Sequence, residues 1–561
     1  MNRMSGAELT IRLLERQGIE CIAGVPGGCN LPLYDALSRS KSIRHVLARH
    51  EQGAGFIAQG LSRSTGRPAV FFATSGPGAT NALTAIADAK LDSVPIICIT
   101  GQVARTMIGS DAFQEVDIYG MSIPITKHNF LVRSVEDLPR VIPEAFTIAV
   151  SGRPGPVLID IPKDVQAAML EVDELPEPGM PQARLEPDPF QVRRAAALLN
   201  AAQRPILLLG GGAAVPDTAR LVLELATANR LPAAMSLLGL GVIPVEHELS
   251  LGMIGMHGAR YTNMLLEETD LLVVIGSRFD DRATGRVDKF CPGAQVIHID
   301  TDASEVNKLR STQIGIIADA GRALEALLPL LDPVDRSPWL RRIAELKRTH
   351  ALVMDGAEDP CAPYGIIRNV ASFLDDSAIV TTDVGQHQMR TAQAYPFVRT
   401  RQWLTSGGLG CMGFGLPAAI GASLANPDST VVCFTGDGSL LMNMQEMATA
   451  VEQKANVKII LCNNTALGLV QQLQELFFNG NVFGTKFSVD VDFRRIAEGF
   501  GIPAVRLCDS PDPMAELEKA LRSQGPYLVE VLVHAEDKVF PMVPPGAANC
   551  DMIEGDSHEK Q

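Results

Sequence analysis

Polar residues stand where one apolar strand of the sequence should end. The run VVCF leads into Gly436, Asp437, Gly438 and Ser439, and a helical pattern begins at once. Glycines let a backbone approach an oxyanion, and the first N–H groups of a helix attract one. Asp437 would repel a phosphate unless a divalent cation joined the two groups. This segment therefore predicts a site for a phosphorylated ligand and a metal ion.

Asn464 supports the prediction of a metal site. It follows the next apolar run, KIILCN. A carboxylate and a carboxamide oxygen from adjacent strand ends are hard ligands suited to Mg²⁺, and we expect the backbone carbonyl of Ala466 to join them. Either segment alone is also typical of an ordinary turn and helix cap. Together, at this spacing, Asp437 and Asn464 favour a magnesium site.

Glu51 lies at the start of a stretch that turns small and apolar, in RHEQGAGFIAQG. Burying an unpaired ionised carboxylate costs several kcal/mol or raises its pKa, so this side chain needs a partner. The partner could be a ligand, or it could be the adjacent Arg49 or His50 in an ordinary salt bridge.

The elements that position these residues form three blocks. Linker-like stretches rich in Pro and acidic residues separate them, at 171–190 and around 330–365. Within each block, short aliphatic strands alternate with helical patterns, which is typical of parallel sheets covered on both faces. The sequence predicts three open parallel-sheet α/β domains with ligands at the carboxyl ends of strands. Their predicted bounds are 1–170, 190–332 and 360–545.

Composition excludes several classes of partner. The net charge of −15 and the absence of a basic tract argue against nucleic acid. No uncharged apolar run approaches the roughly 18–20 residues that span a bilayer. No signal or transit peptide is evident, so a cytoplasmic location is expected. The ten cysteines include no Cys-x-x-Cys pair and are expected to be reduced, largely in the core.

The motif GDGS followed by NN resembles the thiamin diphosphate (ThDP) site of ThDP-dependent decarboxylases and carboligases. Further motifs in all three blocks are similar to the catalytic subunits of the acetohydroxyacid synthase (acetolactate synthase) family. They include SGPGATN, SGRPGPVLIDIPKDVQ, LGMIGMHG, TTDVGQHQM and VFPMVPPGAAN. The resemblance covers nearly the whole chain. It implies an N-terminal pyrimidine-binding domain, a central FAD-binding domain and a C-terminal diphosphate-binding domain.

The resemblance makes Glu51 the acid that meets the aminopyrimidine ring of ThDP and activates the cofactor. It makes Asp437, Asn464 and Ala466 the Mg²⁺ ligands. Met412 would support the bent shape of the cofactor. The other residues assigned to ThDP are Gln386, His387, Gly410, Gly438 and Ser439.

The family's FAD site falls in the middle block. Three glycines, Gly210, Gly211 and Gly212, follow a strand but do not form a G-x-G-x-x-G fingerprint. Asp300, at the end of QVIHID, is expected to bind a ribose hydroxyl. The remaining residues assigned to this site are Met256, His257, Arg278 and Asp319. Carboligation needs no hydride transfer, so the flavin is expected to be structural.

The resemblance assigns substrate contacts to Phe113, Gln114, Lys127, Arg282 and Leu473. Lys127 or Arg282 could hold the carboxylate of a 2-ketoacid, although a residue of either type alone is more often part of a surface salt bridge. Leu473 stands where many members of the family carry a Trp thought to favour 2-ketobutyrate. One methylene in a pocket is worth on the order of 1–3 kcal/mol, so the preference for 2-ketobutyrate over pyruvate is expected to be weak.

The resemblance implies that pyruvate is decarboxylated and joined to a second 2-ketoacid in branched-chain amino acid biosynthesis. The products would be 2-acetolactate from pyruvate and 2-aceto-2-hydroxybutyrate from 2-ketobutyrate. It further implies a homodimer or homotetramer, with each active site shared between chains, and a small regulatory subunit. The alternatives are a catabolic acetolactate synthase without FAD, a pyruvate oxidase and a non-catalytic ThDP- or nucleotide-binding sensor. A fourth, glyoxylate carboligase, would lack the glutamate and is contradicted by Glu51.

Overall fold

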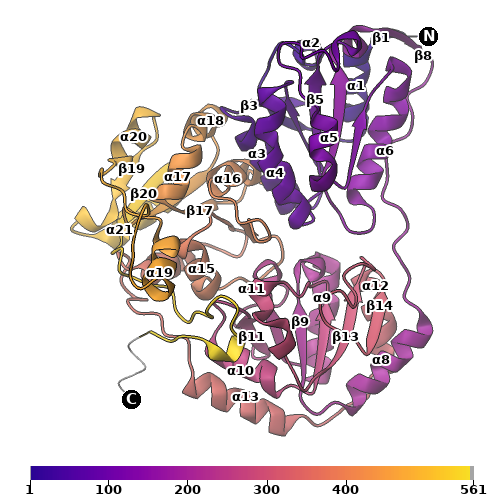
Figure 1. Ribbon diagram of the computed structural model, residues 1–561. Coiled ribbons are helices and arrows are strands. Elements are labelled where there is room, and N and C mark those ends of the chain that lie inside the picture. The colour runs from indigo at the N-terminus through magenta and orange to yellow at the C-terminus, as the bar shows by residue number, and fades with distance from the viewer. Residues whose placement is uncertain (1, 556–561) are drawn as a thin grey trace.

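The computed structural model describes residues 2–555 and contains three six-stranded parallel sheets (Figure 1). Helices cover both faces of each sheet, and the residues of the central strands are mostly buried because parallel sheets of this kind form domain cores. The prediction of three parallel-sheet α/β domains is confirmed. The exact domain bounds at 1–170, 190–332 and 360–545 stay a prediction.

The N-terminal sheet has the strand order β3-β2-β4-β5-β7-β6. Its strands are β2 (Cys21–Gly24), β3 (Arg44–Leu47), β4 (Ala69–Ala73), β5 (Ile96–Gln102), β6 (His128–Leu131) and β7 (Val157–Pro162). Its helices are α1 (Gly6–Arg16), α2 (Leu31–Leu37), α3 (Glu51–Thr65), α4 (Pro77–Leu91), α5 (Ile118–Ser122), α6 (Leu138–Val150) and α7 (Lys163–Ala167). A separate antiparallel pair joins β1 (Asn2–Ser5) to β8 (Met169–Val172).

The middle sheet has the order β11-β10-β9-β12-β13-β14. Its strands are β9 (Pro205–Leu209), β10 (Ala233–Met235), β11 (Ser250–Met253), β12 (Leu271–Ile275), β13 (Gln295–Asp300) and β14 (Ile314–Ile317). The accompanying helices are α8 (Pro189–Ala201), α9 (Pro216–Asn229), α10 (Arg260–Glu268), α11 (Asp281–Thr284), α12 (Ala320–Leu327) and α13 (Ser337–Thr349).

The C-terminal sheet has the order β16-β15-β17-β18-β20-β19. Its strands are β15 (Ile379–Thr382), β16 (Trp403–Thr405), β17 (Val431–Gly436), β18 (Val457–Asn463), β19 (Ala504–Arg506) and β20 (Tyr527–Leu532). Its helices are α14 (Pro363–Phe373), α15 (Gln386–Ala394), α16 (Gly415–Ala425), α17 (Asp437–Asn443), α18 (Glu446–Gln453), α19 (Gly468–Phe477), α20 (Phe493–Gly499) and α21 (Pro513–Arg522).

Helices α3 and α16 join the N- and C-terminal domains through a very close approach. A Cβ atom on Gly60 would lie 2.0 Å from the carbonyl oxygen of Ala418, and one on Gly421 would lie 2.0 Å from that of Ile57. Glycine at these two positions therefore lets the backbones touch. Cores of the two domains are continuous across this contact, because buried residues of both sheets belong to one apolar cluster.

The last segment of the chain returns from the C-terminal domain to the middle domain, as the yellow ribbon beside α10 shows (Figure 1). The N–H of Val543 donates to the carbonyl of Met256 at 2.9 Å, and Ala548 forms a β-bridge with Gly285. Cys361 and Cys508 form a disulfide with Cα atoms 5.7 Å apart, so the expectation that the cysteines are reduced is wrong for this pair. No helix within residues 2–555 is long and apolar enough to cross a membrane.

Candidate active site

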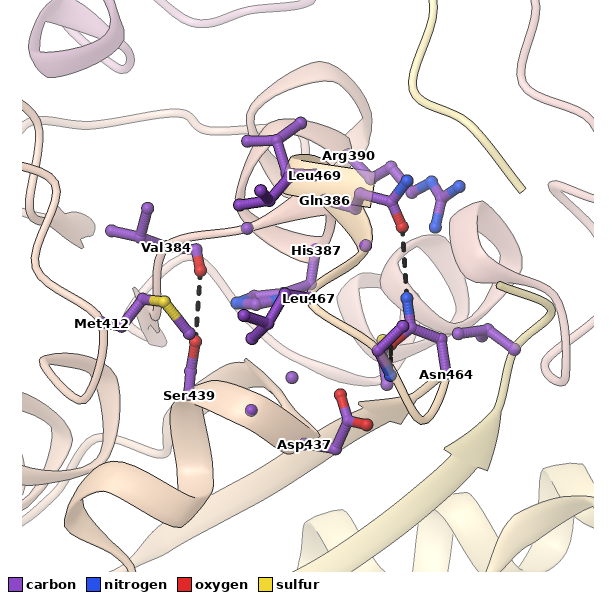
Figure 2. Close-up of a pocket in the computed structure, with 18 residues that line it drawn as sticks. Val384, Gln386, His387, Arg390, Met412, Asp437, Ser439, Asn464, Leu467 and Leu469 are labelled. Atoms are coloured by element: carbon purple, nitrogen blue, oxygen red, sulfur yellow. Dashed lines mark hydrogen bonds between the residues drawn. The ribbon is translucent and has the colours of Figure 1, made fainter. Parts of the chain in front are cut away.

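A pocket of about 110 Å³ opens at the carboxyl edge of the C-terminal sheet (Figure 2). Parallel sheets bind ligands at this edge because all strands end there and their loops converge. The walls come from the β15–α15 connection, the start of α17 and the segment after β18. The lining residues are Val384, Gly385, Gln386, His387, Arg390, Met412, Gly436, Asp437, Gly438, Ser439, Cys462, Asn464, Ala466, Leu467, Gly468, Leu469, Val470 and Val533.

Asp437 is the first residue of α17, directly after β17. Its Oδ2 atom is buried without a hydrogen-bond partner, and burial raises the pKa of the carboxyl group to about 6. A buried acceptor with no donor is what a cation site requires. The carboxylate therefore fits a divalent metal ion.

Asn464 lies close to Asp437 at the edge of the pocket (Figure 2). Its Oδ1 accepts the N–H of Ala466 at 3.1 Å, and its Nδ2 lies 3.4 Å from Oε1 of Gln386. No group of three or more His, Cys, Asp and Glu side chains placed to hold a metal occurs within residues 2–555. A metal here would thus rest on few protein ligands, which suits Mg²⁺ bound largely through phosphate oxygens and water.

Two residues at the start of α15 and one on α17 offer polar atoms to a ligand. His387 is buried, and burial lowers the pKa of its ring to about 3, so the imidazole is neutral and its Nε2 has no partner. Gln386 is held by a hydrogen bond from its Nε2 to the carbonyl of Asp537 at 2.9 Å. Ser439 Oγ donates to the carbonyl of Val384 at 3.2 Å (Figure 2). The residues present fit a diphosphate together with a metal ion.

Met412 lines the pocket, whereas Gly410 lies outside its lining and adopts a positive φ of 76°. Sequence reasoning missed Arg390 and the apolar wall that includes Leu467, Leu469 and Val470. The Arg390 position was recoverable, because it lies one helical turn after Gln386 and so shares its face.

Glu51 begins α3 in the N-terminal domain and is 9% exposed. Asn81 Nδ2 donates to its Oε2 at 3.0 Å. The alternative salt bridge to Arg49 is absent, because that guanidinium binds Glu452 at 2.6 Å. The pKa of Tyr34 is raised, mainly by burial and to a smaller extent by the charge of Glu51. Within one chain, all the lining residues of the pocket come from the C-terminal domain, so Glu51 stands apart from Asp437.

The predicted substrate residues of the N-terminal domain also lie outside the pocket. Phe113 and Gln114 occupy the segment between β5 and α5, where the Phe113 side chain is 87% exposed. The Lys127 ammonium donates to the carbonyls of Ile148 and Ser151 at the end of α6, and burial lowers its pKa to about 8. In a single chain this lysine therefore stabilises a helix terminus.

The two other predicted substrate residues belong to the middle and C-terminal domains. Arg282, on α11, is exposed and has Nη1 3.7 Å from the sulfur of Met256. Leu473 is half-buried on α19 and does not line the pocket. It shares a helix face with the lining residue Leu469, one turn before it.

The middle sheet has the strand order of dinucleotide-binding folds. Counted from its first strand it reads 3-2-1-4-5-6, which places a topological switch point between β9 and β12. Gly210 and Gly212 lie at this point, where a Cβ atom on Gly210 would meet the Gly276 carbonyl at 2.2 Å. Arg278 follows the end of β12. The glycines therefore allow two strand-end loops to approach closely, at the point of the sheet where such folds bind a dinucleotide.

The other residues predicted to bind FAD also follow strand ends of the middle sheet. Asp300 ends β13, and Asp319 caps α12 by accepting the N–H of Arg322 at 3.1 Å. Met256 and His257 follow β11, and the buried His257 ring has Nδ1 3.0 Å from the Pro541 carbonyl oxygen. Burial lowers the pKa of that ring to about 4.

Comparison with known proteins decides the family. The chain matches the thiamine pyrophosphate enzyme N-terminal TPP binding domain at residues 4–121, the central domain at 192–327 and the C-terminal TPP binding domain at 383–531. It is 56% identical to the acetolactate synthase isozyme 1 large subunit of Escherichia coli (strain K12), over 98% of both chains. The chain belongs to the acetolactate synthase family. The resemblance seen in the sequence is confirmed.

Other acetolactate synthases are similar over the same extent. The isozyme 2 large subunit of Escherichia coli (strain K12) is 43% identical over 98% of this chain and 100% of its own length. The chloroplastic acetolactate synthase 1 of Nicotiana tabacum is 43% identical over 98% of this chain and 85% of its own length. This chain contains both TPP binding domains, and thiamine pyrophosphate is another name for ThDP.

Proposed function

We propose that this chain is the catalytic subunit of an acetohydroxyacid synthase. It would decarboxylate pyruvate and ligate the remaining two-carbon unit to a second 2-ketoacid in branched-chain amino acid biosynthesis. The observation that carries the proposal is the buried Asp437 oxygen without a partner, beside the neutral His387, in a pocket at the edge of a TPP-binding domain. The extent of similarity to acetolactate synthases supports the choice of reaction.

The residues of the pocket would divide the work of holding ThDP. Asp437, Asn464 and the Ala466 carbonyl would hold Mg²⁺, which would offset the negative charge of the diphosphate. Gln386 and His387, with the backbone of Gly438 and Ser439, would bind diphosphate oxygens at a helix start. Gly410 and Met412 would contact the pyrimidine end and the bend of the cofactor. When bound, ThDP supplies the carbon nucleophile and the electron sink for loss of carbon dioxide.

Glu51 would share a proton with a pyrimidine nitrogen, while the hydrogen bond from Asn81 holds the other side of the carboxyl group. Because Glu51 stands apart from the pocket of its own chain, this role needs a second copy of the chain. A two-fold dimer would bring the N-terminal domain of each protomer to the pocket of its partner. The same arrangement would also cover Phe113, whose side chain is 87% exposed in the single chain.

Substrate contacts would follow from the same dimer. Phe113, Gln114 and Lys127 would approach the partner's pocket, with Arg282 binding the carboxylate of a 2-ketoacid. Use of Lys127 would require its ammonium to leave the end of α6. Leu473 would offer less apolar contact than a Trp, so pyruvate and 2-ketobutyrate would compete on nearly equal terms.

FAD would bind at the switch point of the middle domain. Gly210, Gly211 and Gly212 would face the pyrophosphate and Asp300 a ribose hydroxyl. Met256, His257, Arg278 and Asp319 would complete the site. Several relatives are named large subunits, which favours a separate regulatory small subunit for this chain as well. A cytoplasmic location fits these roles.

Product analysis tests the proposed function. Purified chain would be incubated with pyruvate, Mg²⁺ and FAD, with and without ThDP, and acetolactate measured as acetoin after acid treatment. We expect acetolactate that depends on ThDP and is absent with the Asp437→Ala chain. Acetate or acetaldehyde as the main product would make the chain an oxidase or a simple decarboxylase. If no turnover occurs even with a small subunit added, the catalytic proposal is wrong.

A further inference from the structure

A buried charged cluster lies between the N- and C-terminal domains, away from the pocket lining. Arg63 on α3 has Nη2 2.9 Å from Oδ2 of Asp92 and 3.2 Å from Oδ2 of Asp88. The side chain of Arg63 is 9% exposed, and those of both acids are fully buried. Asp88 lies on α4 and Asp92 directly follows it. We call these three residues the α3–α4 charge cluster.

The cluster binds the backbone of a segment from the other domain. Asp92 accepts the N–H of Gly407 at 3.0 Å and the N–H of Gly408 at 2.7 Å. Arg63 Nη1 donates to the carbonyl of Thr405 at 3.0 Å. Asp88 accepts the hydroxyl of Ser406. Four consecutive residues at the end of β16 are thus fixed by side chains of the N-terminal domain.

The same segment leads directly to the pocket. The Ser406 hydroxyl accepts the N–H of Cys411 at 2.8 Å, which closes the segment into a loop. The next residue, Met412, lines the pocket. The Arg63 guanidinium also lies 5.1 Å from the ring centre of Phe414, so the cluster contacts the chain on both sides of Met412.

The α3–α4 charge cluster is not needed to hold the N- and C-terminal domains together. The neighbouring α3–α16 contact already joins the domains with small and apolar side chains. Burying two carboxylates with one guanidinium is costly, and burial raises the pKa of Asp88. Carboxylates, unlike apolar side chains, accept directional hydrogen bonds from N–H groups.

We propose that Asp92, with Arg63 and Asp88, positions the 405–412 segment for cofactor binding. This inference rests on the proposed function, because it assumes that Met412 contacts ThDP. Loosening the segment would lower the fraction of molecules with Met412 in place. The apparent dissociation constant of the cofactor then rises in proportion, while saturating cofactor restores the rate.

The test uses Asp92→Asn in the full chain, with FAD and Mg²⁺ present. The ThDP dissociation constant is measured by titration calorimetry, and acetolactate formation is measured across ThDP concentrations. We expect the dissociation constant to rise about tenfold while kcat at saturating ThDP and the KM for pyruvate change less than about twofold. A merely structural defect would instead reduce the active fraction and kcat, and leave half-saturation unchanged.

Ser406→Ala is the second variant, in case the charge change impairs folding. It removes the contact to Asp88 together with the hydrogen bond from the N–H of Cys411, and should raise the ThDP dissociation constant about threefold. The matched control is Lys458→Met, which removes a buried cation bound to the carbonyls of Ser523 and Gly525 at the far end of β18. It should lower Tm without changing ThDP binding.

Each outcome separates this inference from the proposed function. Unchanged ThDP binding by both Asp92→Asn and Ser406→Ala overturns the inference, as does an equal shift in Lys458→Met. A wild-type chain that binds ThDP but makes no acetolactate overturns the proposed reaction, while the binding comparison still tests the positioning role. A wild-type chain that does not bind ThDP overturns both.

Discussion

The N- and C-terminal domains share a strand order and differ in what their strand ends carry. Counted from the first strand of each sheet, both read 2-1-3-4-6-5. The third strand of the C-terminal sheet, β17, leads directly into Asp437 and a helix. The third strand of the N-terminal sheet, β4, leads through Thr74 and Ser75 to α4, which starts at a proline that has no N–H. The topology fixes where a ligand can bind, and the strand-end residues decide which part of it binds there.

The helices after the second strands show the complementary difference. In the N-terminal domain α3 begins with Glu51, whereas the corresponding α16 begins with Gly415. These two helices pack on each other, so the domains face one another in a pseudo-symmetric pair. On the proposed function, one domain therefore supplies the acid and the other supplies the anion and metal site. A single chain holds two unlike half-sites.

The largest effect should come from the C-terminal half-site. Asp437→Ala removes the buried carboxylate of the proposed metal site, and we expect acetolactate formation to fall more than about 10³-fold. Titration of the Asp437→Ala chain with ThDP in the presence of Mg²⁺ should show no binding. The matched control is Asp335→Ala, an exposed carboxylate outside the pocket lining that accepts the N–H of Ser337 at the start of α13. Normal ThDP binding by the Asp437→Ala chain would contradict the assignment of Asp437 as a metal ligand.

The N-terminal half-site should affect rate more than binding. Glu51→Gln keeps the size of the side chain but loses the acid, and general acid–base groups contribute about 10²–10⁴-fold to rate. We expect acetolactate formation to fall by about that factor, with the ThDP dissociation constant within about threefold of wild type. Equal losses of binding and rate would mean that the two half-sites do not divide the work as the comparison indicates.

Mixing the two inactive chains tests whether the half-sites meet across a dimer. After subunit exchange, a dimer of one Glu51→Gln chain and one Asp437→Ala chain would have one intact site and one doubly altered site. Random pairing should restore about a quarter of wild-type activity. The measurement is acetolactate formation before and after exchange, with each variant alone as control. No recovery in mixed dimers isolated by two different affinity tags would place both residues in one chain's site.

The smallest effect concerns an acid that anchors the N-terminal sheet. Burial raises the pKa of Asp160, on β7, to about 7, although it accepts hydrogen bonds from Thr100 and Gln102. The folded chain thus holds a proton that the unfolded chain loses above pH ~4, and stability falls as pH rises from about 4 to 7. The free energy of unfolding of Asp160→Asn, relative to wild type, should rise by on the order of 3 kcal/mol over this window.

Thermal unfolding at pH 5 and pH 8 measures that difference. A Tm difference between variant and wild type that is the same at both pH values would contradict the raised pKa of Asp160. Asp335→Ala serves again as control, because the pKa of this exposed carboxyl is lowered, chiefly by the Ser337 side chain, and its effect should be constant between those pH values.

The sequence was most informative where chemistry depends on local order along the chain. The strand ends at Asp437 and Asn464 were predictable, because a parallel sheet brings adjacent strand ends together. Contacts between distant segments were not predictable. Asp92 and Gly408 are 316 positions apart, and nothing near Asp92 reveals that its carboxylate binds a backbone in another domain.

A residue within a family motif can also make structural contacts that the motif does not reveal. The motif around Lys127 predicts a substrate contact, yet the structure places its ammonium at the end of α6. The Cys361–Cys508 disulfide was missed for a different reason, since neither cysteine lies in a recognisable pair along the sequence.

The return of the C-terminal segment to the middle domain matters for how the protein is made. During synthesis the strands of the middle sheet leave the ribosome well before residues 543–548, which later bind Met256 and bridge to Gly285. Domains generally fold as units from the N-terminus during translation. The loops that carry Met256 and Arg282 therefore acquire this support only once residues 543–548 have been made. A chain that stops short of these residues has every strand of the middle sheet but lacks the segment that supports these two loops.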